Sequence, residues 1–94
     1  MNKEKVQSLA QARSKIDEID SHIIELIATR QFYVDQVIRF KRSMENVPSP
    51  RIDEVLNHVK TQAQEQGLDP DLIAQLYQEM IQHFIRRELK EIRP

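Results

Sequence analysis

The stretch that decides the fold is Leu9–Lys41, LAQARSKIDEIDSHIIELIATRQFYVDQVIRFK, which contains neither proline nor glycine. From its first residue, steps of four and three lead through positions 13, 16, 20, 23, 27, 30, 34, 37 and 41. Steps of this size return to one face of an α-helix. Apolar residues hold most positions of this seam: Leu9, Ile16, Ile23, Ile27, Val34 and Val37. The pattern predicts one long helix over about residues 5–42.

Two shorter helices are predicted after a break that ends at Ser49 and Pro50. This pair is typical of a helix N-cap and first helical position, and Asp69 with Pro70 repeats it. Gly67 is typical of a helix end. Apolar residues recur at helical spacing in both segments: Ile52, Val55, Leu56, Val59 and Ala63, then Leu72, Ile73, Leu76, Tyr77, Met80, Ile81, Phe84, Ile85, Leu89 and Ile92. The sequence thus predicts an all-α protein with three helices, one of them long, in a single domain over residues 1–94.

Composition excludes several function classes. Charged residues make up 31% of the chain, yet the net charge is only -1, which argues against a nucleic-acid or anionic-membrane partner. The chain has no cysteine, so thiolate sites are excluded, and its histidines lack metal-ligand spacing, so no metal is expected. No stretch approaches the roughly 20 apolar residues that span a bilayer, and the charged N-terminus lacks an apolar signal core. A cytoplasmic location is expected.

The predicted first helix is too long for a compact monomer. About 38 residues make a helix about 57 Å long at about 1.5 Å per residue. A globule of this size is only roughly 30 Å across. The helix would overhang any monomeric fold, and its exposed apolar seam needs a partner. A second copy of the chain is the simplest partner for this seam, so a homodimer is expected.

Three cations occupy seam positions where apolar residues are expected: Arg13, Arg30 and Lys41. Long basic side chains can reach solvent from a core edge, but three on one seam favour an anion, and Asp20 cannot serve all of them. Arg30 and Lys41 point the same way within about 20° and lie about 16 Å apart. Arg13 is about 25 Å from Arg30, so an antiparallel partner helix would have to deliver it. Such a pocket suits a small ligand with carboxylates.

Glu88 is a second anomaly, because it continues the apolar face of the third predicted helix after Ile81 and Phe84. Two interpretations stay open. The carboxyl group either reaches solvent at the end of the helix or lies inside the same pocket as the cations.

The spacing of Arg13, Arg30 and Lys41 on one long helix resembles the all-helical class of chorismate mutases. The segments RSKIDEID at 13–20 and IIELIATR at 23–30 are similar to the opening motif of that family. The likeness covers nearly the whole chain. It implies the type II chorismate mutase fold, an intertwined homodimer in which each site takes one arginine from the other subunit. It also implies a chorismate-type substrate, a ring dicarboxylate with an enolpyruvyl ether.

The resemblance also implies roles for individual residues. Arg13 of one chain and Arg30 of the other hold the two carboxylates, and Lys41 donates to the ether oxygen whose bond breaks. Arg51 matches the family's second-helix arginine and is expected to bind substrate. The implied reaction is a pericyclic rearrangement to prephenate that needs no cofactor, because the work is to hold a compact conformer and stabilise charge on the departing oxygen.

Several residues depart from the family pattern. Pro48 and Ile52 stand where members often carry acids that approach the ring hydroxyl of the substrate. Glu88 replaces the last-helix glutamine that assists the ether oxygen, and Phe84 replaces a small hydroxyl residue. The apolar residue after Arg51 resembles the isochorismate pyruvate-lyase branch, which makes salicylate and pyruvate but usually keeps the glutamine.

Three functions follow from these observations. The predicted function is a chorismate mutase of aromatic amino acid biosynthesis. The alternative is an isochorismate pyruvate-lyase of salicylate biosynthesis. A non-catalytic helical dimer that binds another molecule through the same grooves is the third.

Overall fold

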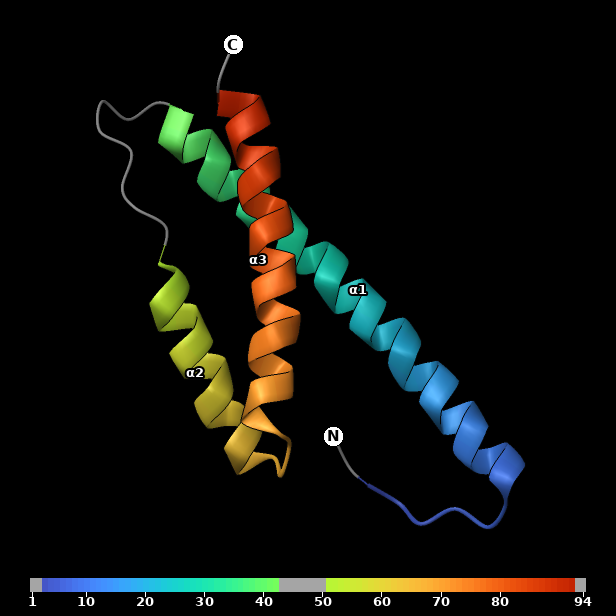
Figure 1. Cartoon of the computed structure of the whole chain (residues 1–94). Coiled ribbons are helices and arrows are strands. Elements are labelled where there is room, and N and C mark those ends of the chain that lie inside the picture. The colour runs from blue at the N-terminus through green and yellow to red at the C-terminus, as the bar shows by residue number, and fades with distance from the viewer. Residues whose placement is uncertain (1–2, 43–50, 93–94) are drawn as a thin grey trace. The chain divides into compact units, whose positions relative to one another are not determined.

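The computed structural model describes residues 3–42 and 51–92, without the side chains of Lys41, Arg42, Glu88, Leu89, Glu91 and Ile92. These ranges form three α-helices and no strand (Figure 1): α1 (Leu9–Arg42), α2 (Ile52–Glu65) and α3 (Pro70–Ile92). The chain divides into two compact units, Met1–Gln36 and Val37–Pro94. The prediction of an all-α fold with one long helix is confirmed, whereas the single domain over residues 1–94 stays a prediction.

α1 begins at Leu9, about one turn later than predicted, because Ser8 caps it. The Ser8 Oγ accepts a hydrogen bond from the backbone N–H of Gln11 at 3.1 Å. The Gln11 Oε1 in turn accepts one from the backbone N–H of Gln7 at 2.7 Å. This exchange resembles a capping box, which satisfies N–H groups that a helix start leaves without partners. Residues 3–8 lie outside the helix and are called the N-terminal arm below.

α2 begins at Ile52, whereas the sequence predicts a start at Ser49 and Pro50. Both of those residues lie outside the described part of the chain. The residue before the helix is Arg51, whose φ of -91° and ψ of 51° are not helical and whose side chain makes no cap hydrogen bond. Acidic residues in the first turn of α2 place negative charge near the positive end of the helix dipole and help to stabilise the start.

The end of α2 follows the prediction at Gly67, which has a φ of 75°. In this left-handed conformation, Leu68 N donates to Ala63 O at 2.8 Å and Gly67 N donates to Gln64 O at 3.1 Å. These two bonds form a Schellman motif, which satisfies carbonyl groups at a helix end and favours glycine at the left-handed position.

The start of α3 also follows the prediction. The Asp69 Oδ1 accepts a hydrogen bond from the backbone N–H of Asp71 at 2.9 Å. Pro70 occupies the first helical position, where its missing N–H costs nothing. The close spacing of these two caps turns the chain back on itself, so that α2 and α3 pack as an antiparallel pair within unit Val37–Pro94 (Figure 1).

The core of unit Val37–Pro94 is apolar. Its most deeply buried hydrophobic side chains are Ile38, Val59, Ala63, Ile81 and Phe84. The predicted inner face of α2 is confirmed at Val59 and Ala63, since a spacing of four residues returns to one helix face. Burial of each large apolar side chain contributes about 1.5–3 kcal/mol.

We expect Ile81→Ala to lower the free energy of unfolding by about 2–5 kcal/mol, because it deletes buried methyl groups and leaves a cavity. Urea unfolding followed by circular dichroism, at one protein concentration, measures this loss. The matched control is Ile81→Val, which should cost only about 0.5–1.5 kcal/mol. Equal, small losses from both variants would contradict a core role for Ile81.

α1 carries an exposed apolar face that the predicted seam covers only in part. A second column of residues at seven-residue spacing lies beside the seam, at positions 12, 19, 26, 33 and 40. We call the two columns together the heptad face: Leu9, Ala12, Ile16, Ile19, Ile23, Leu26, Arg30, Tyr33, Val37 and Phe40. All members except Ala12 and Arg30 are exposed. Alternating steps of three and four are typical of a helix that packs along another helix.

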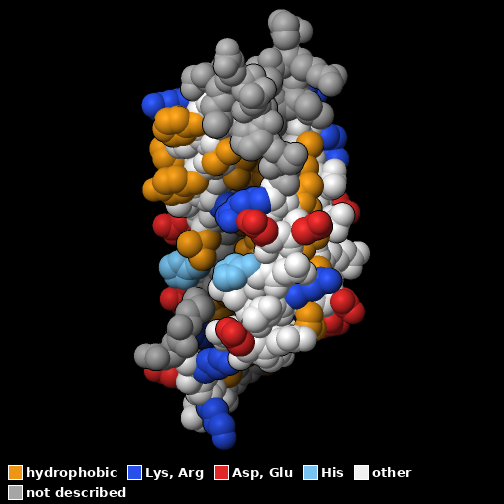
Figure 2. Space-filling view, turned by 90° about the vertical axis from the view of Figure 1, so that its left-hand side faces the viewer, with side chains coloured by type: hydrophobic (Ala, Val, Ile, Leu, Met, Phe, Trp, Pro, Cys, Tyr) orange, Lys and Arg blue, Asp and Glu red, His pale blue; other side chains and the backbone are white. Residues whose placement is uncertain are grey.

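Hydrophobic side chains are visible between charged ones in the space-filling view (Figure 2). Among the described residues, no helix combines the length and apolar character that a membrane span requires.

Candidate functional site

The three predicted cationic residues all lie on α1. Arg13 is exposed and forms no ion pair with any other described residue. Arg30 is half-buried, its Nη1 is buried, and its side chain is engaged with other groups of the protein. Lys41 lies in the last turn, and its side chain is outside the described residues. The guanidinium group of Arg13 is therefore available to a ligand or to a second chain.

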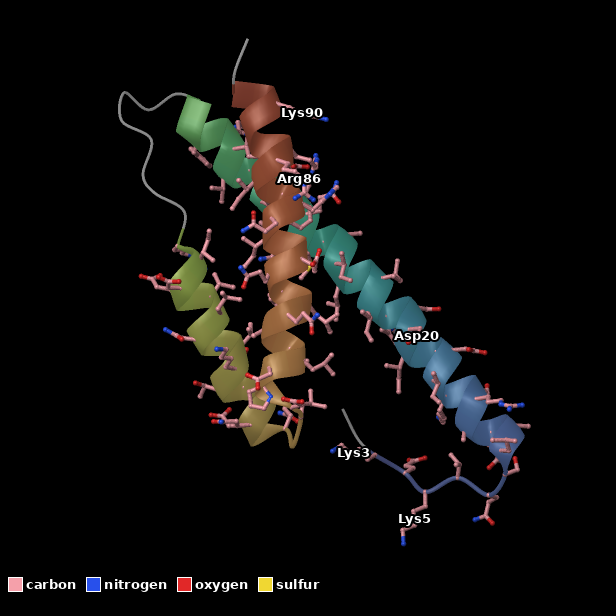
Figure 3. The ribbon with its side chains drawn as sticks, viewed as in Figure 1. Lys3, Lys5, Asp20, Arg86 and Lys90 are labelled. Carbon is pink, nitrogen blue, oxygen red and sulfur yellow. The ribbon has the colours of Figure 1, made fainter. Side chains whose placement is uncertain are left out.

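Asp20, the acid on the predicted seam, is exposed on α1 (Figure 3). Within the described residues it forms no ion pair. A local, exposed ion pair joins Lys15 Nζ to Glu18 Oε2 at 3.9 Å, and His22 Nδ1 lies 3.9 Å from Glu25 Oε2 on the same helix. Asp20 therefore does not neutralise a seam cation within its own unit.

The start of α2 presents a cation followed by an apolar residue. Arg51 is exposed, and its Nη1 lies 3.6 Å from Glu54 Oε2. Ile52, the first helical residue, is half-buried. Pro48, the other departure from the family pattern in this region, lies outside the described residues. The described part of this segment therefore offers a positive charge and an apolar wall.

The predicted site residues of α3 are Phe84 and Glu88. Phe84 is only 6% exposed. Its ring meets the edge of His83 with centroids 5.5 Å apart, and the guanidinium carbon of Arg87 lies 5.9 Å from its centroid. Glu88 lies one turn further along the helix, and its side chain is outside the described residues. Phe84 thus packs in the core of its unit and holds a cation against its face.

The antiparallel pairing of α2 and α3 brings two of the predicted positions to one end of this helix pair. Ile52 and Phe84 lie at similar distances along the chain from the turn at Gly67. Arg30 belongs to the other unit, Met1–Gln36. The structure therefore groups the α2 and α3 candidates, and it leaves the prediction of a joint site with Arg13 and Arg30 untested.

Two charged residues that the sequence did not single out are half-buried. They are Asp35 on α1 and Arg87 on α3, and the Asp35 Oδ1 and the Arg87 Nη1 are buried. Both side chains are engaged with other groups of the protein, as burial of charge requires. The only sequence signal for their burial is that Asp35 follows the apolar Val34 and that Arg87 lies about one turn after the apolar Phe84. In the described ranges, no cluster of three or more histidine or acidic residues is arranged to hold a metal ion.

Comparisons with known proteins converge on one family. The family model described as chorismate mutase type II matches residues 12–89, a range that contains Arg13, Arg30, Lys41 and Glu88. An isochorismate pyruvate lyase from Pseudomonas aeruginosa is 34% identical over 83 residues, which cover 87% of this chain and 82% of that relative. A chorismate mutase from Methanocaldococcus jannaschii is 30% identical over 81 residues, which cover 83% of this chain and 81% of the relative. The chain belongs to the type II chorismate mutase family.

Proposed function

We propose that this chain catalyses the rearrangement of chorismate to prephenate in a cationic site shared between two copies of the chain. The observation that carries this proposal is the placement of Arg13, Arg30 and Lys41 on one continuous helix of a chorismate mutase family member. Two arginines suit a dicarboxylate, because each guanidinium group can bind a carboxylate with two parallel hydrogen bonds.

The distance along α1 requires a second chain. Arg13 and Arg30 lie about 25 Å apart at about 1.5 Å per residue, which exceeds the reach of two side chains toward one small ligand. The exposed heptad face supports dimer formation, because a long apolar stripe in water favours burial against a partner. Arg30 is the one charged member of that face. A guanidinium group at this position can bind a carboxylate of the substrate with two parallel hydrogen bonds.

Each residue has a defined task in this mechanism. Arg13 of one copy and Arg30 of the other hold the two carboxylates, so that the ends of the enolpyruvyl ether approach each other. One carbon–oxygen bond breaks while one carbon–carbon bond forms, and no cofactor takes part. Lys41 donates a hydrogen bond to the ether oxygen as it gains negative charge. Loss of one such preorganised donor typically costs about 2.7–4 kcal/mol of transition-state stabilisation.

A second candidate is the elimination of pyruvate from isochorismate to give salicylate. Two observations favour it. The apolar Ile52 stands at the start of α2, where an acid that approaches the ring hydroxyl is expected in mutases. The relative from Pseudomonas aeruginosa is named for this lyase reaction. The same cations would hold isochorismate, because both substrates carry two carboxylates and the same ether.

Purified protein incubated separately with chorismate and isochorismate tests both candidates. Formation of prephenate supports the mutase, and formation of salicylate with pyruvate supports the lyase. A protein that turns over neither substrate and binds neither would contradict both, and it would favour a non-catalytic helical dimer. The reaction is expected to take place in the cytoplasm, and fractionation of cells would test that location.

A separate prediction concerns Glu88. A carboxylate can only accept hydrogen bonds, so Glu88 can assist the ether oxygen only in its protonated form. If it lies in the site, activity of the wild type should rise as the pH falls, until substrate or fold is lost. Glu88→Gln should remove this dependence and keep or improve the rate at neutral pH. Identical pH profiles of kcat/KM for the two proteins would place Glu88 at the solvent-facing end of α3.

A further inference from the structure

A groove lies between the N-terminal arm and the first turns of α1, within unit Met1–Gln36. Its volume is about 570 Å³. Figure 3 shows the arm, with Lys3 and Lys5 labelled, as it doubles back beside the start of the helix. The apolar lining comes from Val6 of the arm and from Ala12, Ile16 and Ile19 of α1. The floor of the groove is therefore part of the heptad face, and the arm forms its wall.

The heptad face also carries a side chain suited to such a groove. Tyr33 is 63% exposed, and its ring meets the edge of Phe32 with centroids 5.2 Å apart. A large exposed aromatic group on an apolar face is typical of a contact with another molecule. The tyrosine hydroxyl also suits a groove with a charged rim, which here includes Lys3 and Glu4, because it can remain hydrogen-bonded while the ring is buried.

Antiparallel pairing of two copies of α1 would place these two features against each other. In such a pair, the two columns of one heptad face meet the opposite columns of the other. One register covers the whole face, whereas a shift by seven residues leaves an end uncovered. That register pairs Leu9 with Phe40, Ala12 with Val37, Ile16 with Tyr33, Ile19 with Arg30 and Ile23 with Leu26. Tyr33 of each copy thus lies opposite the groove residue Ile16 of the other.

The same register places the cations where the proposed site needs them. It sets Arg13 of one copy across from Gln36 of the other, between Arg30 and Lys41. At about 1.5 Å per residue, Arg13 is offset along the helix axis by about 9 Å from Arg30 of the other copy and by about 8 Å from its Lys41. Long side chains can span these distances. The apolar pairs alone determine this register, so the convergence of the cations supports it independently.

We propose that the groove receives Tyr33 of a second copy, and that the N-terminal arm is a docking element that positions Arg13 in the other subunit's site. This inference rests on the proposed shared site. Arg13 lies between Ala12 and Ile16 of the groove, and Tyr33 lies one turn from Arg30. Seating Tyr33 therefore ties the turn that carries Arg13 to the turn that carries Arg30 of the other copy.

Disulfide trapping tests the docking directly, since the chain has no cysteine of its own. Val6→Cys and Tyr33→Cys single variants are mixed, allowed to exchange subunits and oxidised. A covalent dimer is expected, because a bridge forms only between Cα atoms within about 7 Å. The matched control pairs Val6→Cys with Phe32→Cys. Residue 32 is adjacent to Tyr33 in α1 but its side chain points in another direction, so this pair should remain uncrosslinked. A pair of Ile16→Cys with Leu26→Cys reports a register shifted by seven residues.

A second measurement examines positioning. Tyr33→Ala should raise the dimer dissociation constant about 30-fold or more, as expected for an aromatic anchor. Activity should then fall on dilution and recover at high protein concentration. Tyr33→Phe keeps the ring and should restore the wild-type dissociation constant. Phe32→Ala, which removes an equally accessible aromatic group beside it, should leave the dimer intact.

The outcomes separate this inference from the proposed function. A dimer that is active on chorismate or isochorismate, but that crosslinks through Ile16 and Leu26 or not through Val6 and Tyr33, overturns the docking model and leaves the function standing. A protein that is monomeric and inactive on both substrates overturns the proposed function and the docking model together.

Discussion

Neither Arg13→Ala nor Lys41→Ala should retain measurable activity alone, yet a mixture of the two should be active. Each substitution removes a charge contact worth several kcal/mol in a site shielded from water. In a heterodimer, one site receives Arg13 from one chain and Lys41 from the other and is intact, whereas its twin lacks both. With random exchange, about one quarter of the wild-type sites are restored. Steady-state assays before and after exchange measure the recovery.

The control for this experiment is a mixture of the Arg13→Ala variant with a double variant that carries both Arg13→Ala and Lys41→Ala. No combination of these chains forms an intact site, because all of them lack Arg13. Exchange itself must be verified with differently tagged chains. If tagged heterodimers form and activity does not return, Arg13 and Lys41 do not serve one site from different subunits.

Ile52→Glu should shift the enzyme toward the mutase reaction. A carboxylate at the first position of α2 can accept a hydrogen bond from the ring hydroxyl of chorismate, which an apolar wall cannot do. A hydrogen bond to a charged group contributes about 1.5–3 kcal/mol, or about 10- to 150-fold in kcat/KM. Residue 52 lies in the first turn of α2, where the helix dipole favours a negative charge. Parallel assays with chorismate and isochorismate measure the shift.

Ile52→Gln is the matched control, because it adds a polar group of the same length without the charge and should give a smaller gain. Lower mutase activity in Ile52→Glu, with an unchanged circular dichroism spectrum, would show that this position does not face the substrate.

Local chemistry made the turn between α2 and α3 predictable. Gly67 and Asp69 act through hydrogen bonds to near neighbours in the chain, so the sequence alone contains both partners. The predicted start of α2, Ser49 before Pro50, carries the same kind of signal, and both residues lie outside the described part of the chain. Arg51 has a non-helical ψ of 51°, which places the boundary after it.

The heptad face was only partly predictable for a geometric reason. From Leu9, a step of four reaches Arg13 and a step of three reaches Ala12, and both residues lie close to the same side of a helix. The predicted seam takes the step of four to Arg13 and so includes the cations. It therefore omits the neighbouring column that contains Leu26 and Tyr33. The exposure of these side chains in the structure revealed the second column. The proposed site is completed by a second chain, so one sequence carries only part of its pattern, and the roles of Arg13 and Lys41 stay predictions.

The capped turn at Gly67 also sets an order of events during synthesis. Its bonds join residues close in the chain, such as Leu68 and Ala63, and contacts this local form quickly. The turn between α2 and α3 can therefore form within one chain. α1 is made before α2 and α3, and at about 5–20 residues per second the next 50 or so residues take roughly 2–10 s. In the proposed dimer, its apolar face is covered only after α2 and α3 have been made. Charged neighbours such as Lys15 and Glu18 then oppose aggregation of the newly made helix until a second chain binds in the proposed dimer.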